Sequence, residues 1–156
     1  MRFSLVDRIV ELHPGERIVA LKTVSLSEEY LQDHFPLFPV LPGVFMLEAM
    51  TQASAWLIRA SEDFAHSVVT LKEARNVKYA NFLSPGQTLR IEAEIQKQDD
   101  QQTKLKVEGT VDGKLYVSGR LVVERYNLSD SKPNQEGSDN YVKCEQRKMF
   151  ALLNRT

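Results

Sequence analysis

The chain has one cysteine, few glycines and no long hydrophobic run, and each of these shortages excludes a class of protein. The single cysteine, Cys144, cannot form an internal disulfide, which is typical of proteins in a reducing cytoplasm. The N-terminal residues lack the apolar stretch of a signal peptide, and no run reaches the length of a membrane-spanning helix, so we expect neither. The seven glycines are scattered and form no phosphate-binding loop.

An excess of charge of one sign is also missing. The 156 residues carry 20 basic and 21 acidic side chains, a formal net charge of −1, which gives no reason to expect binding to nucleic acid or to an anionic membrane. No group of histidine, cysteine and carboxylate residues has the spacing of metal ligands, and we expect no metal or other cofactor. The hydrophobic content of 42% is ordinary for one globular domain.

The chemistry of the chain is concentrated in one segment, HFPLFPVLPGVFMLEAMTQ, from His34 to Gln52. Its three prolines fix the backbone and disfavour helix, so we predict a stiff, extended loop from His34 to Pro42. Pro42-Gly43 is typical of a helix start. Apolar residues then lie on nearly all sides up to about Ala60, which predicts a buried helix.

His34 and Glu48 are the candidate acid/base pair of this segment. Alone, a histidine before a proline is usually a loop residue, and a glutamate early in a helix usually complements the helix dipole. Together, a base held by a rigid loop and a carboxyl group in an apolar helix favour an acid/base enzyme. The free N–H groups at the helix start, at Gly43, can donate hydrogen bonds to a polarised carbonyl oxygen.

The motif HFPxxPVxPGVxxxEAxxQ resembles the active-site signature of the 3-hydroxyacyl-[acyl-carrier-protein] dehydratases of fatty-acid synthesis. FSLVDRIVELHPGERIVALKTVS, from Phe3 to Ser25, is similar to the first hairpin of that family. NVKYANFLSPGQTLRIEAEI, from Asn76 to Ile95, is similar to its strand, proline-glycine turn and next strand. The resemblance covers roughly residues 3–125 and implies a hotdog fold, an α+β architecture in which an antiparallel β-sheet wraps around one long central helix.

The resemblance also implies roles and partners. His34 and Glu48 would be catalytic, and the N–H of Gly43 would polarise the thioester carbonyl, with Gln52 in support. The active sites would be shared across a homodimer, possibly within a trimer of dimers, and the substrate would arrive on acyl-carrier protein. The acyl tunnel would be lined by the apolar residues Phe38, Val44 and Met46. The candidate docking charges for the acidic carrier are Arg59, Lys72, Arg75 and Lys78.

Two rival functions stay open. A hotdog acyl thioesterase shares the fold and can use a helix carboxylate. A non-catalytic hotdog protein that only binds acyl-carrier protein would also carry this sequence pattern.

The remaining sequence predicts a domain from 1 to 126 and a tail from 127 to 156. Alternating polar and apolar residues, together with turn signals, predict the strands of the domain, and Ser27–Leu31 is expected to form a short helical turn. The expected strands are Leu5–Leu12, Arg17–Ser25, Val68–Tyr79, Leu89–Gln96, Lys104–Val111 and Leu115–Val123. In the tail, Asn127–Asn140 has the composition of a flexible linker, and Asp139–Leu153 forms either a short helix or a frayed extension.

Overall fold

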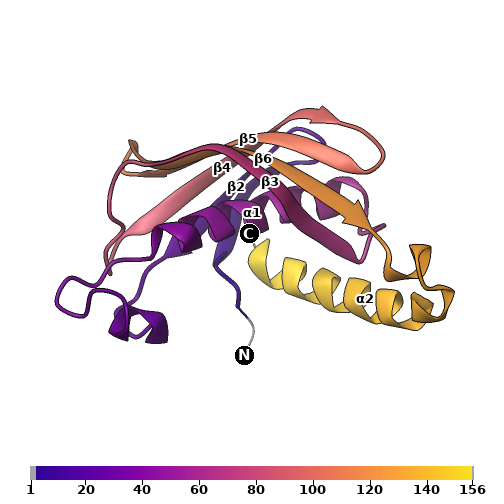
Figure 1. Cartoon of the computed structure of the whole chain (residues 1–156), viewed down its shortest axis with the longest axis horizontal. Helices are drawn as coiled ribbons and strands as arrows, with labels where there is room; N and C mark the ends of the chain where they lie inside the picture. Colours follow the sequence, from indigo (N-terminus) through magenta and orange to yellow (C-terminus); the bar gives the residue numbers. More distant parts are fainter. Residues whose placement is uncertain (1–2, 156) are drawn as a thin grey trace.

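The computed structural model describes residues 3–155, in which a six-stranded antiparallel sheet curves around one long helix, α1 (Figure 1). The strand order across the sheet is β1-β2-β4-β5-β6-β3. The strands are β1 (Arg8–His13), β2 (Arg17–Thr23), β3 (Val68–Tyr79), β4 (Thr88–Gln98), β5 (Gln102–Val111) and β6 (Lys114–Tyr126). The helices are α1 (Gly43–Ser61) and α2 (Glu136–Leu153), with 3-10 turns η1 (Glu29–Gln32), η2 (Leu128–Asp130) and η3 (Pro133–Gln135).

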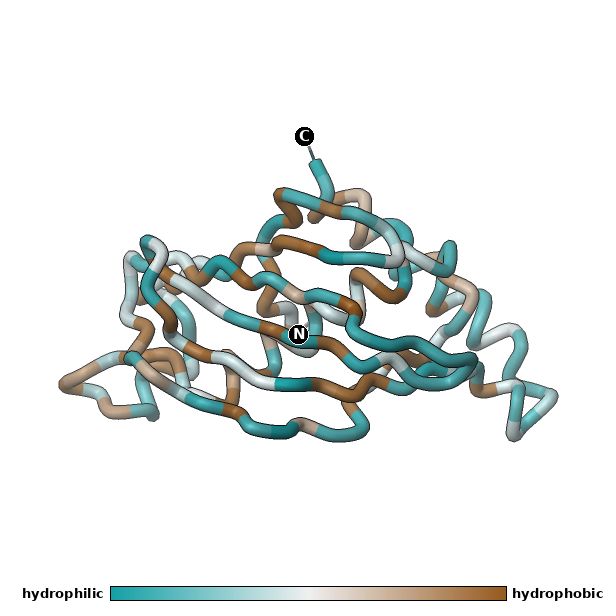
Figure 2. The backbone as a smooth tube through the Cα atoms, turned by 90° about the horizontal axis from the view of Figure 1, so that it is seen from above, coloured by the Kyte–Doolittle hydropathy of each residue, from teal (hydrophilic) through white to brown (hydrophobic). Residues whose placement is uncertain are grey.

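The core lies between α1 and the concave face of the sheet. Along β5 every second residue is buried, and the alternation of hydrophobic and hydrophilic positions on the strands is visible in Figure 2. Met50 and Leu57 of α1 are fully buried in the same cluster as Ile91 of β4. Full burial of one such side chain contributes roughly 1.5–3 kcal/mol, so this contact surface fixes the position of α1.

Strand β3 is an edge of the sheet and pairs only with β6 among the described strands. It is 12 residues long, and its register against β6 shifts between Leu71 and Glu73 and again between Arg75 and Lys78. Asn76, inside the second irregularity, has a positive φ of 52°. A long edge strand presents a row of backbone donors and acceptors that another strand can pair with.

The predicted α+β arrangement of a sheet around one central helix is confirmed, with element boundaries shifted by a few residues. We had predicted an extended loop from His34 to Pro42, but the loop is not extended throughout. The N–H of Phe38 donates to the carbonyl of Phe35 at 2.7 Å, which closes a tight turn around Pro36. Proline is compatible with the second position of such a turn, so the proline-rich composition did not exclude it.

The tail differs from the predicted flexible linker, because residues 127–135 form η2 and η3 and the second helix already begins at Glu136. The carboxylate of Asp139 accepts hydrogen bonds from the backbone N–H groups of Leu128 and Ser129, both at 2.9 Å, and from the hydroxyl of Ser67. These contacts fix the polar segment to α2 and to the main domain.

Helix α2 packs against the C-terminal end of α1 and the loop that follows it. The Phe150 ring lies 6.1 Å from the Trp56 ring and 5.4 Å from the Phe64 ring. Arg147 donates to the carboxylate of Asp63 at 2.7 Å, and Gln146 donates to the carbonyl of Ser67 at 2.9 Å. A helix that is marginal alone is therefore held by a surface of its own chain.

Candidate functional site

His34 lies in a cavity of about 310 Å³ at the N-terminal end of α1. The turn after it places the Phe35 ring 4.6 Å from the imidazole, and Phe35 adopts a positive φ of 49°. The imidazole is half-buried, whereas the rings of Phe35 and Phe82 at the cavity rim are exposed. The rest of the lining comes from the start of α1 and the end of β3: Val40, Leu41, Gly43, Met46, Tyr79, Ala80 and Asn81.

Gly43 is the first residue of α1 and faces the same cavity. A Cβ atom at this position would meet the Tyr79 ring at 3.2 Å, so glycine allows the ring and the helix start to approach closely. The first N–H groups of a helix have no acceptor within the helix and carry positive potential. Partial burial raises the pKa of the Tyr79 phenol above its ordinary value.

Glu48 lies in a second cavity, of about 300 Å³, further along α1. The side-chain amide of Gln52 donates to Oε1 of Glu48 at 2.9 Å and to the carbonyl of Phe3 at 3.1 Å. Its own oxygen accepts from the N–H of Leu5 at 2.8 Å. The chain segment before β1 thereby fixes Gln52, and Gln52 fixes the carboxyl group.

The two candidate catalytic residues are not brought together within one chain. No residue lines both cavities, and each cavity reaches a different end of β3. Val69, Thr70 and Leu71, at the start of β3, border the Glu48 cavity, whereas Tyr79, at its end, borders the His34 cavity. The length of this edge strand therefore separates the two groups.

The three predicted tunnel residues have different surroundings. Met46 is buried and lines the His34 cavity. Phe38 and Val44 are exposed and line neither cavity; the Phe38 ring packs edge-on against Phe82 at 5.5 Å. Their role in a tunnel stays a prediction.

Arg59 departs from the surface position that we had expected of a docking charge. It lies in the Glu48 cavity, with its guanidinium 5.0 Å from the centre of the Trp56 ring, and burial lowers its pKa to about 10. No pattern in the sequence indicates this placement, because an arginine near the end of a helix is usually solvated. Tyr79 was also missed, since nothing in a strand pattern identifies the residue that contacts a helix start.

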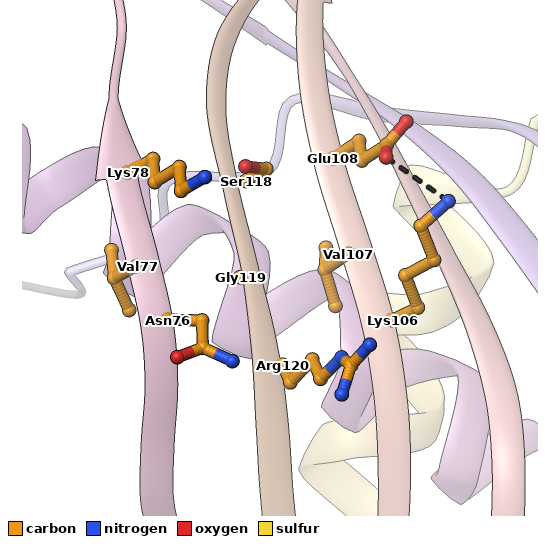
Figure 3. A pocket seen from close by; sticks show the side chains of 9 residues that line it. All are labelled: Asn76, Val77, Lys78, Lys106, Val107, Glu108, Ser118, Gly119 and Arg120. Carbon is orange, nitrogen blue, oxygen red and sulfur yellow. Dashed lines mark ion pairs between the residues drawn. The ribbon is translucent and has the colours of Figure 1, made fainter.

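The other three basic candidates are exposed on β3. Lys72 lies 3.6 Å from Glu124, and Arg75 pairs with Glu73 at 2.6 Å. Lys78 borders a shallow polar groove across β3, β6 and β5, in which Lys106 pairs with Glu108 at 3.1 Å and Arg120 adds a further positive charge (Figure 3). This groove is lined by neither His34 nor Glu48.

Among residues 3–155, no three histidine, cysteine or acidic residues are grouped so that they could hold a metal ion. No helix in that range is long and apolar enough to cross a membrane.

Solved structures resemble the chain in fold. The dehydratase heterocomplex ApeI:P from Xenorhabdus doucetiae matches with a TM-score of 0.68 and 23% identity, covering 85% of this chain and 89% of the other. The smu.793 protein from Streptococcus mutans, solved with acetyl CoA, matches with a TM-score of 0.60 and 13% identity over 80% of this chain and 91% of the other. The sheet wrapped around α1 is accordingly the hotdog fold.

Curated proteins named 3-hydroxyacyl-[acyl-carrier-protein] dehydratase FabZ resemble the chain in sequence. The one from Ruminiclostridium cellulolyticum is 39% identical over 119 residues, which cover 76% of this chain and 84% of the relative. The one from Lactococcus lactis is 38% identical over 119 residues, which cover 76% and 82%. The family model of the FabA-like domain matches residues 1–125. The chain belongs to the FabA-like domain family.

Proposed function

We propose that this chain is a 3-hydroxyacyl-[acyl-carrier-protein] dehydratase, which removes water from its substrate to give the trans-2-enoyl thioester in fatty-acid biosynthesis. The observation that carries this proposal is the pair of cavities at the two ends of β3, one with an imidazole and a helix N-terminus, the other with a carboxyl group. The relatives named as such dehydratases support the same reaction.

The active site forms between two copies of the chain. If two β3 edges pair antiparallel about a two-fold axis near the middle of the strand, the start of one strand lies beside the end of the other. The Glu48 cavity of one protomer then adjoins the His34 cavity of its partner. The exposed side chains of Phe35 and Phe82, which line the His34 cavity, supply apolar area for such an interface.

The reaction is an elimination that uses one base and one acid. The N–H groups at the start of α1 hydrogen-bond the thioester oxygen and stabilise the negative charge that develops there. The neutral imidazole of His34 takes the proton from C2, and the electron pair of that bond forms the C2–C3 double bond. The C3–O bond breaks as Glu48, in its acid form, gives its proton to the leaving hydroxyl, and water departs. Gln52 holds the carboxyl group in place.

The carrier protein docks on the basic side of β3. Lys78 is exposed next to Tyr79, which borders the His34 cavity, and Arg120 lies across the groove of Figure 3. Acyl-carrier protein is acidic, so these charges complement it. We also propose a cytoplasmic location, which suits a chain with one cysteine.

The first experiment follows the absorbance of the enoyl thioester while the purified chain acts on 3-hydroxyacyl carrier-protein thioesters of several chain lengths. We expect turnover by the wild type and its loss in His34→Ala and in Glu48→Gln, with circular dichroism spectra unchanged. Release of free acid without enoyl product would support a thioesterase instead. Binding of the carrier without any product would support a non-catalytic protein.

The second experiment tests the shared site. His34→Ala and Glu48→Gln chains, each inactive, are unfolded, mixed in equal amounts and refolded. Half of the dimers then combine the two variants, and each of these has one intact site, so we expect activity to return to about one quarter of the wild-type value. Mixing without refolding serves as the control. Activity that stays absent after refolding would contradict the dimeric site.

A further inference from the structure

The cavity that holds Glu48 extends along α1 to Arg59, about three turns or roughly 16 Å further along the helix. Glu48, Gln52, Ala55 and Arg59 follow one another on the same side of α1, opposite Val69–Leu71 of β3. In the proposed reaction Glu48 acts at C3, and the thioester lies toward the His34 cavity. The stretch between Glu48 and Arg59 is then the part of the cavity that receives the acyl chain.

The far end of this stretch is polar. Arg59 is half-buried, and its Nε atom is fully covered and has no hydrogen-bond acceptor among residues 3–155. Its guanidinium lies 5.0 Å from the centre of the Trp56 ring, and no carboxylate of the described residues forms an ion pair with it. A covered N–H donor without an acceptor is unfavourable, so an oxygen acceptor that reaches the guanidinium of Arg59 would stabilise this arrangement.

Neighbouring contacts hold the arginine in this position. The Trp56 ring beneath it packs against Phe150 of α2, and α2 is itself tied to the domain through Asp139 and Gln146. Thr51 and Thr70 add hydroxyl groups to the cavity wall. The Thr51 hydroxyl already donates to the Leu47 carbonyl at 3.0 Å, so the covered Nε of Arg59 is the polar atom that an alkyl chain ending in a methyl group would leave without an acceptor.

We infer that Arg59 and Trp56 form a recognition site for a carboxylate, or another strong oxygen acceptor, at the far end of the acyl chain. This inference rests on the proposed function and deepens it by naming the substrate class: a 3-hydroxyacyl thioester of medium length that carries an anionic terminus. A charge-assisted hydrogen bond to the guanidinium satisfies the covered cation, and the Trp56 face supports the methylene groups that precede the terminus.

The test compares pairs of 3-hydroxyacyl carrier-protein thioesters that have the same number of carbons and end either in a carboxylate or in a methyl group. We expect kcat/KM of the wild type to be at least about tenfold higher for the carboxylate-ended member at medium chain length. Arg59→Met, which keeps an unbranched apolar stem and removes the charge, is expected to lower this ratio about tenfold, and Arg59→Lys to keep part of it. Arg8→Met, which removes an exposed arginine of β1, is the matched control and should leave the ratio unchanged.

A ratio near one in the wild type, or a ratio that Arg59→Met does not change, would overturn the inference and leave the dehydratase proposal intact. Turnover of neither substrate would instead count against the dehydratase. In that case the binding of carrier protein loaded with saturated acyl amides, carboxylate-ended or methyl-ended, is measured by calorimetry. Tighter binding of the carboxylate-ended amide that is lost in Arg59→Met supports the site, and equal binding of the two amides refutes it.

Discussion

The side-chain amide of Gln52 joins Glu48 to the chain segment that precedes β1. It donates to the Glu48 carboxyl at 2.9 Å, one turn earlier on α1, while its remaining polar atoms bond to the backbone of Phe3 and Leu5. All three hydrogen bonds use one amide group, so its orientation is fixed from both sides. Gln52 is therefore a positioning residue for the candidate acid.

Gln52→Ala should lower kcat about tenfold while KM changes little, because a hydrogen bond between uncharged groups contributes roughly 0.5–1.5 kcal/mol and this one orients a reacting group. Steady-state kinetics on one 3-hydroxyacyl carrier-protein substrate measures the effect. Gln98→Ala is the matched control, since Gln98 donates to Glu62 at 2.8 Å and neither residue lines the His34 or the Glu48 cavity. A rise in KM with kcat unchanged would show that Gln52 binds substrate instead.

Substitution of two helix-start glycines should separate stability from activity. Gly43→Ala places a methyl group 3.2 Å from the Tyr79 ring in the His34 cavity, so the ring must shift and kcat/KM should fall. Gly137→Ala adds a methyl group in open space on α2 and should stabilise the protein by about 0.5 kcal/mol. Thermal unfolding and enoyl formation are measured for both variants. Full activity in Gly43→Ala would contradict a close fit at the start of α1.

Cross-linking tests the pairing of two β3 strands. In a Cys144→Ser background, Ala74→Cys near the middle of β3 should form a disulfide-linked dimer on mild oxidation, because antiparallel neighbours lie about 4.5–5.5 Å apart. The measurement is a non-reducing gel. Lys104→Cys, an exposed position on the interior strand β5, should remain monomeric on the same gel. Equal dimer formation by both variants would indicate random collision.

The start and end of α1 could be predicted from the sequence, because Pro42-Gly43 marks the first turn and neither proline nor glycine interrupts the helix after it. The separation of His34 from Glu48 in the folded chain could not be predicted from the sequence. Their spacing in sequence does not show that the two residues line different cavities, which border opposite ends of the edge strand β3.

The order of residues 127–135 could not be predicted either, because it depends on contacts that are distant in sequence. The segment is polar and contains few residues that could form a core. Its backbone is held by Asp139, whose carboxylate also accepts from Ser67, far earlier in the chain. Arg59 is a similar case, since only the packing of Trp56 against α2 shows that the guanidinium lies inside.

The attachment of α2 should weaken in acid. Burial raises the pKa of Asp139, but the hydrogen bonds from Ser67, Ser129 and Leu128 outweigh it and hold that pKa well below its ordinary value of 3.8. The charged carboxylate therefore stabilises the fold above pH 3.8, and this contribution is lost as the pH falls below 3.8 toward the folded-state value.

Urea unfolding and hydrogen exchange of the α2 amides at pH 7 and pH 3 measure this effect. Asp139→Asn should be less stable than the wild type at pH 7, and the difference should shrink at pH 3. Asp130→Asn is the control, because Asp130 is exposed and caps only η2 through Asn127. A difference that is as large at pH 3 as at pH 7 would contradict a role for the charge.

The positive φ of Phe35 has a consequence for how this protein tolerates change. A non-glycine residue in the left-handed region costs roughly 1–2 kcal/mol, and here that cost falls on the residue whose ring lies beside the imidazole. Phe35→Gly would relieve the strain and remove the ring together. The strain that glycine would relieve is thus the strain that accompanies an aromatic ring 4.6 Å from the imidazole, so one residue sets both the local stability of the turn and the surroundings of His34.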